Sequence, residues 1–162
     1  MREQRRRVGR RTVLVIHPDR AVRARLVRTI QGSVTNDDSS QVEVEAVASF
    51  QEAGARSERP DAIVTCAPPP LDETAAVNDG ASRAALPKRL RRVPCVVVID
   101  RPDFNEVVAA LRLRPAGVVL PDSPPAVIQA AVRLALQDAG VIFDASLSAI
   151  LTDPSRRGPA GR

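Results

Sequence analysis

Few side chains in this 162-residue chain have both the type and the placement for chemistry. The single histidine, His17, follows an apolar run and precedes Pro18 and Asp19, while Asp100 follows another apolar run. An imidazole with two carboxylates can ligate a metal ion, so His17, Asp19 and Asp100 form one candidate site. The pattern favours the simpler interpretation that Asp19 caps a helix and His17 is a polar residue at a strand end, so we expect no metal.

The two cysteines are the remaining candidate nucleophiles. Cys66 ends one apolar run and Cys95 begins another. No cationic residue ends a neighbouring run, so a buried, inert thiol is favoured at Cys66 over a reactive thiolate. In adjacent parallel strands the two cysteines lie at opposite ends, about 13 Å apart at ~3.3 Å per residue. A disulfide requires a Cα separation of about 4.4 to 6.8 Å, so none is expected between them.

Known catalytic motifs are absent from the sequence. It contains no glycine-rich phosphate loop, no Cys-x-x-Cys pair and no G-x-S-x-G elbow, and a Ser-His-Asp arrangement would depend on His17 without a serine at another strand end. We therefore predict that the protein is not an enzyme and holds no cofactor.

Short apolar runs alternate with helical patterns along the chain. The expected strands are residues 12–16, 42–48, 62–66, 96–99 and 117–120. Helices are expected after Asp19, Ser49, Asp103 and Ser123, of which Ser123 is followed by Pro124 in the pattern of an N-cap with proline at the first helical position. Residues 67–91 are expected to be a loop with an irregular helix broken at Pro87. This alternation predicts an α/β fold, a doubly wound parallel sheet with helices on both faces.

Four stretches resemble the receiver domain of bacterial response regulators, of the kind that precedes a LuxR-type helix-turn-helix. They are VLVIHPDRAVRARL (13–26), RPDAIVTC (59–66), VPCVVVID (93–100) and ALRLRPAGVVLPDSPPAVIQAAVRLAL (110–136). The resemblance implies a five-stranded, flavodoxin-like sheet with strand order 2-1-3-4-5. AGVIFDASL (139–147) resembles the link that leads to the DNA-binding domain.

The resemblance also shows which chemical groups this chain lacks. Receivers carry an acidic pair that holds Mg²⁺, a phospho-accepting Asp, a Ser or Thr, and a Lys. Here those positions hold His17 with Pro18, Cys66, Ile99 and Pro121, in that order. Phosphoryl transfer requires a metal and cations to offset charge on the transferred oxygens. The sequence therefore predicts a degenerate pseudo-receiver, an atypical receiver that acts in signal transduction through protein contacts.

The resemblance implies a docking face for a protein partner or a homodimer, within residues 104–136. Its exposed candidates are Asn105, Arg112, Arg114, Asp122, Gln129 and Arg133. A plain solvated surface remains an alternative for these residues. Two other functions stay open: a remnant of a transcriptional regulator that acts through a partner or its basic tails, and a small ligand in the mouth lined by the degenerate pocket positions.

Charge and composition set the expected domain limits. Residues 1–11 carry six arginines and one glutamate, and residues 152–162 carry three arginines and one aspartate, so both are expected to be disordered basic tails. The pseudo-receiver spans 12–138, followed by a short extension over 139–151. Acids slightly outnumber bases between the tails, which predicts no basic face on the body and nucleic-acid contact only through the tails. No apolar segment is long enough to span a membrane, so a cytoplasmic protein is expected.

Overall fold

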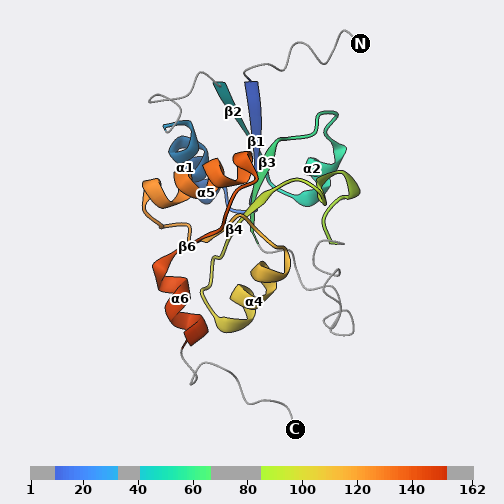
Figure 1. Cartoon of the computed structure of the whole chain (residues 1–162). Coiled ribbons are helices and arrows are strands. Elements are labelled where there is room, and N and C mark those ends of the chain that lie inside the picture. The colour runs from blue at the N-terminus through green and yellow to red at the C-terminus, as the bar shows by residue number, and fades with distance from the viewer. Residues whose placement is uncertain (1–9, 33–40, 67–84, 153–162) are drawn as a thin grey trace.

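A computed structural model describes residues 10–32, 41–66 and 85–152, which form one parallel sheet flanked by helices (Figure 1). The strands are β1 (Arg10–Ile16), β2 (Gln41–Val47), β3 (Ala62–Cys66), β4 (Cys95–Val98), β5 (Gly117–Val119) and β6 (Ile142–Phe143). The spatial order is β2-β1-β3-β4-β5-β6. This confirms the doubly wound parallel sheet and the expected order of its first five strands.

The expectation of only five strands was wrong. β6 pairs in parallel with β5, with Gly117 opposite Ile142 and Val118 opposite Phe143. The backbone N–H of Ile142 donates to the carbonyl of Ala116 at 3.0 Å. The segment that resembles a link to another domain thus satisfies backbone groups at the β5 edge, which would otherwise be unpaired.

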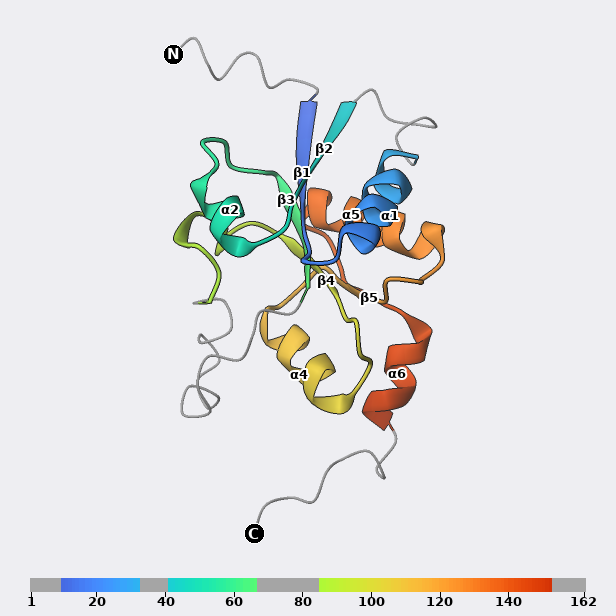
Figure 2. The ribbon, with the colours of Figure 1, turned by 180° about the vertical axis from the view of Figure 1, so that it is seen from behind.

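The helices cover both faces of the sheet (Figures 1 and 2). They are α1 (Arg20–Gln31), α2 (Phe50–Ala55), α4 (Phe104–Arg112), α5 (Pro125–Gln137) and α6 (Ala145–Thr152), with a 3-10 turn η3 (Lys88–Leu90). The apolar side chains of α1 and α5 pack in one buried cluster, and those of α2, η3, α4 and α6 pack in the other. The irregular helix expected over 82–91 is reduced to η3 among the described residues, and 67–84 lie outside them.

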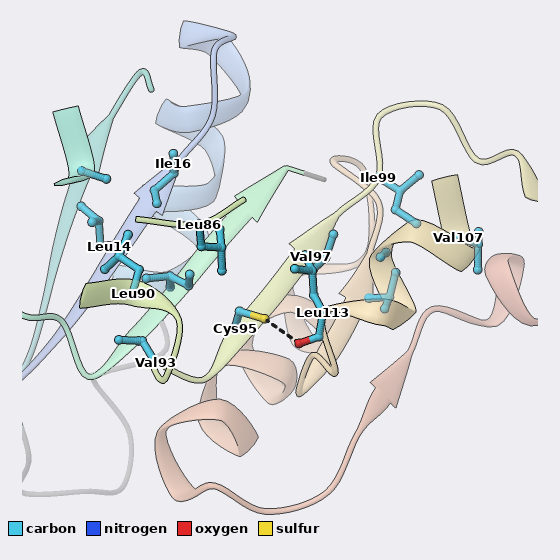
Figure 3. Close-up of a cluster of buried hydrophobic side chains, with 14 of the residues drawn as sticks. Leu14, Ile16, Leu86, Leu90, Val93, Cys95, Val97, Ile99, Val107 and Leu113 are labelled. Carbon is cyan, nitrogen blue, oxygen red and sulfur yellow. Dashed lines mark hydrogen bonds between the residues drawn. The ribbon is translucent and has the colours of Figure 1, made fainter. Parts of the chain in front are cut away.

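Alternation along the strands explains the two clusters. In β1, Val13 and Val15 point toward α1 and α5, whereas Leu14 and Ile16 belong to the opposite cluster. Figure 3 shows the second cluster, in which Leu14 and Ile16 lie with aliphatic side chains from η3, β4 and α4. Both faces of the strand are therefore buried, as expected for a parallel sheet with helices on each side.

Three of the expected helix caps are confirmed. The carboxylate of Asp19 accepts hydrogen bonds from the N–H groups of Ala21 and Val22, at 2.7 and 3.1 Å. The hydroxyl of Ser49 accepts from the N–H of Glu52, and the carboxylate of Asp103 accepts from the N–H of Glu106. These bonds satisfy N–H groups that a first helical turn leaves without an intrahelical partner.

Close packing of α5 on the sheet depends on Gly117. A Cβ at this position would lie 2.7 Å from the Cβ of Ala131 and 3.4 Å from the carbonyl oxygen of Ile142. The glycine therefore lets α5 approach β5 while β6 pairs on the other side. It sets the spacing of α5, β5 and β6.

Candidate functional site

The degenerate pocket positions meet at the carboxyl end of the sheet. β1 ends at Ile16, so His17 is the next residue, and Cys66 is the last residue of β3. Ile99 follows β4, and Pro121 lies two residues beyond β5. Because β1, β3, β4 and β5 are successive neighbours, these positions form one row along the edge, the region where such sheets bind ligands.

A buried histidine bridges two strand ends in this row. The Nε2 atom of His17 lies 3.0 Å from both carboxylate oxygens of Asp100, and the residue is only 1% exposed. Its Nδ1 atom accepts a hydrogen bond from the backbone N–H of Asp19 at 3.1 Å. Since Nδ1 is an acceptor, the geometry fits the neutral ring that carries its proton on Nε2 and donates it to Asp100. The bridge joins the end of β1 to the end of β4.

The loop after β1 is held by a cation. A guanidinium nitrogen of Arg23 donates to the carbonyl oxygens of His17 and Pro18, at 2.6 and 2.8 Å. The amides of Val22 and Ala21 hold the pKa of the Asp19 carboxyl below its ordinary value, against a smaller opposing effect of burial. The positive charge of Arg23 lowers it further. The backbone around His17 is therefore fixed on both sides of the ring.

Cys66 lies between the strands that carry this bridge, because β3 separates β1 from β4. Burial raises the pKa of its thiol above the ordinary value, and the negative charge of Asp100 raises it further. Both effects disfavour the thiolate, which is the nucleophilic form. The position that the sequence aligns with the phospho-acceptor of receivers thus carries a protonated thiol at neutral pH.

The two remaining pocket positions supply no polar side chain. Ile99 is fully buried, and its side chain lies in the cluster of Figure 3. Pro121 is half-buried and has no N–H group. The site therefore has no hydroxyl and no ammonium where a receiver has Ser or Thr and Lys.

The residues present do not fit the Mg²⁺ ion of a receiver. Mg²⁺ prefers carboxylate oxygens and retained waters. The carboxylate of Asp19 accepts two helix N–H groups, that of Asp100 faces His17, and Pro18 has no donor atom in its side chain. In the part of the chain that the structure describes, no group of three His, Cys, Asp or Glu residues is placed to hold a metal ion. The grouping of His17, Asp19 and Asp100 is instead a hydrogen-bonded cluster.

The two cysteines occupy opposite ends of their strands, as expected. Cys66 is paired with Val98, whereas Cys95 is paired with Ile63 three residues earlier. Both are free thiols. The Sγ atom of Cys95 contacts the carbonyl of Leu113 at 4.0 Å, which places it at the other end of the sheet from the pocket (Figure 3).

Ser123 is not the N-cap that the sequence suggested. Pro124 is the cap residue of α5, with no side-chain hydrogen bond, and Pro125 begins the helix. The hydroxyl of Ser123 instead accepts from the N–H of Leu120 at 2.8 Å and donates to the carboxylate of Asp144. Both residues of this pair are buried, at 2% and 7% exposure. This contact joins the β5–α5 loop to the start of α6. Because the two residues are far apart in the sequence, no local pattern predicts it.

Asp144 anchors the C-terminal segment at the sheet. Burial acts to raise the pKa of its carboxyl, but hydrogen bonds from Ser123 and Ser146 outweigh this and hold the pKa below the ordinary value. The N–H of Ser146 donates to the other carboxylate oxygen at 2.9 Å. The charged carboxylate therefore connects the first turn of α6 to the loop that carries Pro121.

The C-terminal segment covers part of the expected docking face. Leu147 is fully buried and Ile150 is 4% exposed, both in the cluster that contains Val107 of α4 and Val118 of β5. α4 and α6 lie side by side in both views (Figures 1 and 2). The expected face is thus bordered by β6 and α6 rather than open at β5.

The six candidate residues of that face lie in different places. Asn105, Arg112, Arg114 and Asp122 are exposed on α4 and on the loops after α4 and β5. The side-chain amide of Gln129 donates to the carbonyl of Thr29 at 2.9 Å, so this residue lies at the contact of α5 with α1. Arg133, one turn further along α5, is exposed. Three of the six candidates, Asn105, Arg112 and Arg114, therefore lie on or directly after α4.

Comparisons with known proteins connect this architecture to one group of structures. No protein-family model and no curated protein matches the sequence. A LuxR family DNA-binding response regulator from Silicibacter pomeroyi is similar in structure, with a TM-score of 0.56, 19% identity, and coverage of 83% of this chain and 96% of that one. The isolated REC domain of RcsB from Salmonella enterica serovar Typhimurium gives a TM-score of 0.60 and 15% identity, with coverage of 87% and 98%.

A third structure sets the scale of the likeness. The response regulator ChrA of a heme-sensing two-component system gives a TM-score of 0.58 and 20% identity over 89% of this chain, but the match spans only 65% of ChrA. Among the described residues, no helix is long and apolar enough to cross a membrane. The shared strand order and the coverage of a complete isolated receiver lead to one conclusion: this chain has the fold of a response-regulator receiver domain.

Proposed function

We propose that the protein is an atypical receiver domain that acts in signal transduction through protein contacts without taking up a phosphoryl group. The observation that carries this proposal is the His17–Asp100 bridge, which joins the ends of β1 and β4 on either side of Cys66. The protonated thiol of Cys66 replaces the carboxylate nucleophile, His17 with Pro18 replaces the acidic pair that holds the metal, and Pro121 replaces the neutralising lysine.

The direct test is a titration of the full chain with Mg²⁺ and beryllofluoride, followed by backbone amide NMR at Asp19, Cys66 and Ile99. We expect no shifts at saturating concentrations. The isolated RcsB receiver, whose structure was determined in the presence of this phosphomimetic, is the positive control. Saturable shifts at the three amides would show that a functional phosphate site survives and would reject the proposal.

A restored acceptor provides a stricter version of this test. In C66D the chain regains a carboxylate at the end of β3, but Pro18 and Pro121 still supply neither a metal ligand nor a cation. We expect no phosphate incorporation from acetyl phosphate with Mg²⁺, because nothing offsets the charge on the transferred oxygens. Phosphate incorporation into C66D, but not into wild type, would show that other side chains supply the metal ligand and the cation, and would contradict this expectation.

We propose that the partner surface lies on the α4 side, around Asn105, Arg112 and Arg114, with α6 as its neighbour. These side chains are exposed and belong to elements that are ordered by the common core. Sedimentation velocity of the full chain tests a homodimer at this surface. A mass that rises with concentration and falls in R112E, but not in the control K88E, is expected; equal behaviour of both variants would reject this location.

A role in transcription is the second candidate. The similar proteins include response regulators described as DNA-binding or as acting in DNA interaction. Such a role would require DNA contact by a partner or by the arginine-rich residues 1–11 and 152–162. Loss of duplex DNA binding after neutralisation of the arginines of 1–9 and 152–162, with Arg10 and Arg11 kept, would assign the contact to these tails.

A further inference from the structure

The helical layer formed by α1 and α5 carries positive charge without acids. α1 contains Arg20, Arg23, Arg25 and Arg28, and α5 contains Arg133, while neither helix contains Asp or Glu. The net charge of the region between the two tails is close to neutral because the acidic residues lie on other elements. That net charge therefore does not reveal the positive layer. The expectation that the folded body has no basic face therefore does not hold for this layer.

Four of the cationic side chains on this side are available to solvent. Arg20, Arg25, Arg28 and Arg133 are exposed, and no ion pair involves them among the described residues. Arg23 is different because its guanidinium binds the carbonyls of His17 and Pro18. We name the four exposed residues, together with Arg11, the α1–α5 basic face.

Contacts between the helices place these arginines on one surface. The Gln129–Thr29 hydrogen bond joins α5 to α1 at 2.9 Å, and the helices lie side by side in both views (Figures 1 and 2). Arg25 lies one turn before Thr29, and Arg133 lies one turn after Gln129. The guanidinium groups therefore flank the contact line of the two helices from both ends.

Arg11 extends this surface to the start of the sheet. Its guanidinium donates to the carbonyl of Leu136 in the last turn of α5 at 2.9 Å, and the residue is exposed. The preceding Arg10 is paired with Glu43 at 2.6 Å and does not contribute. Residues 1–9, which carry four further arginines, are joined to the chain at this same end of β1.

The basic face lacks the aromatic and large aliphatic side chains that a protein interface or a membrane-binding surface would use. The chain has three aromatic residues, Phe50, Phe104 and Phe143, and all of them pack against the cluster on the opposite side of the sheet. The exposed uncharged residues of α1 and α5 are three alanines, two glutamines and one proline. Without aromatic or large aliphatic anchors, the face has neither a base-stacking platform nor a hydrophobic interface centre. Charge is what it offers.

We propose that the α1–α5 basic face binds the phosphate backbone of duplex DNA without reading its sequence. Guanidinium groups match phosphate oxygens by paired N–H donors, and a regular polyanion suits several arginines spread over two parallel helices. Nearby acids leave the face open, because the carboxylates of Asp19 and Asp61 are engaged by backbone N–H groups, whereas Asp122 and Asp138 lie outside α5 at its two ends. The site is separate from the degenerate pocket and from the α4 side.

Fluorescence anisotropy of the full chain with a labelled duplex of mixed sequence, over a salt series, tests this proposal. The variant R25Q/R28Q/R133Q removes three charges from the face, and the control K88Q/R92Q/R101Q removes three exposed charges elsewhere. If each arginine neutralises one phosphate, the variant lowers the log–log salt slope by about 2 to 3 and weakens binding at low salt at least about tenfold. The control is expected to retain affinity within about twofold of wild type, as a surface that makes no phosphate contact should.

The other outcomes would overturn the proposal. Equal losses in the two triple variants would show a response to net charge alone. Loss on neutralising Arg2, Arg5, Arg6 and Arg7, with R25Q/R28Q/R133Q unaffected, would assign binding to the tail. Binding to vesicles with anionic headgroups but not to duplex DNA would assign the face to a lipid surface. Absence of DNA binding by the wild type at low salt would remove the function altogether.

Discussion

The most informative single contact is the one between a buried imidazole and a half-exposed carboxylate. His17 has both ring nitrogens occupied, one by the N–H of Asp19 and the other by Asp100. His17 and Asp100 are 83 positions apart in the sequence. The fold, and not the local sequence, therefore brings these two side chains together. The bridge couples the β1 loop to the β4 loop in a family fold where those loops otherwise surround a phosphate.

Removal of the carboxylate should therefore destabilise the protein. In D100A the Nε2–H of His17 keeps its burial but loses its acceptor, which we expect to lower the free energy of unfolding by about 1 kcal/mol. This loss of unfolding free energy is at the low end of the range for a buried donor without an acceptor. The Asp100 side chain is 47% exposed, so a water molecule can take the place of its carboxylate. Urea denaturation measures the change, with D122A as the control. Equal stability of the two variants would show that the bridge contributes nothing.

The carboxyl of Asp144 supplies a pH-dependent part of the stability. Its folded pKa lies below the ordinary value of 3.8, so the folded state binds fewer protons than the unfolded state in this range. The contribution is therefore complete above the ordinary pKa and is lost as pH falls through the folded value. We expect D144N to be less stable than wild type at neutral pH and the difference to shrink below about pH 4. Thermal unfolding at several pH values measures this, and a pH-independent difference would contradict it.

At the scale of elements, the sequence predicts what depends on periodicity and misses what depends on distant partners. Short, largely apolar runs identified β1, β3 and β4, and polar caps such as Asp19 and Ser49 marked helix starts correctly. β6 has only two residues and gains its hydrogen bonds from β5, so no periodic pattern reveals it. Ser123 followed by Pro124 has the pattern of a cap, but the Ser123 hydroxyl donates a hydrogen bond to the buried carboxylate of Asp144 instead.

The packing of α5 on β5 can be tested at one atom pair. In G117A the added methyl group would meet the Cβ of Ala131 at 2.7 Å, so helix or strand must shift. We expect a loss of about 1 to 3 kcal/mol in unfolding free energy, as for other overpacked sites. The double variant G117A/A131G also removes the opposing methyl group, so it should be less destabilised than the sum of the two single variants. A double-mutant cycle separates this recovery from the cost of placing a glycine in a helix. Additive losses would place the strain elsewhere.

For the whole molecule, the two faces of the sheet have different tasks. One carries α1 and α5 with their exposed arginines, and the other buries most of the large apolar side chains under α2, η3, α4 and α6. The last element of the described chain closes this second face, because Leu147 and Ile150 of α6 fill the cluster beside Val107. The C-terminal segment thus belongs to the domain core, where the resemblance suggested a link.

Release of α6 should therefore change the association state of the protein. In L147D/I150D two carboxylates replace buried aliphatic side chains, and burying unpaired charges costs more than detaching the helix. Detachment exposes the apolar surface of Phe104, Leu111 and Phe143, a surface of the kind that drives association. We expect a folded protein by circular dichroism whose sedimentation shows dimers or larger species. The control S148D/A149D places the same two charges on the exposed side of α6 and should leave the mass unchanged. A monomeric, folded L147D/I150D would mean that α4 and β5 need no cover.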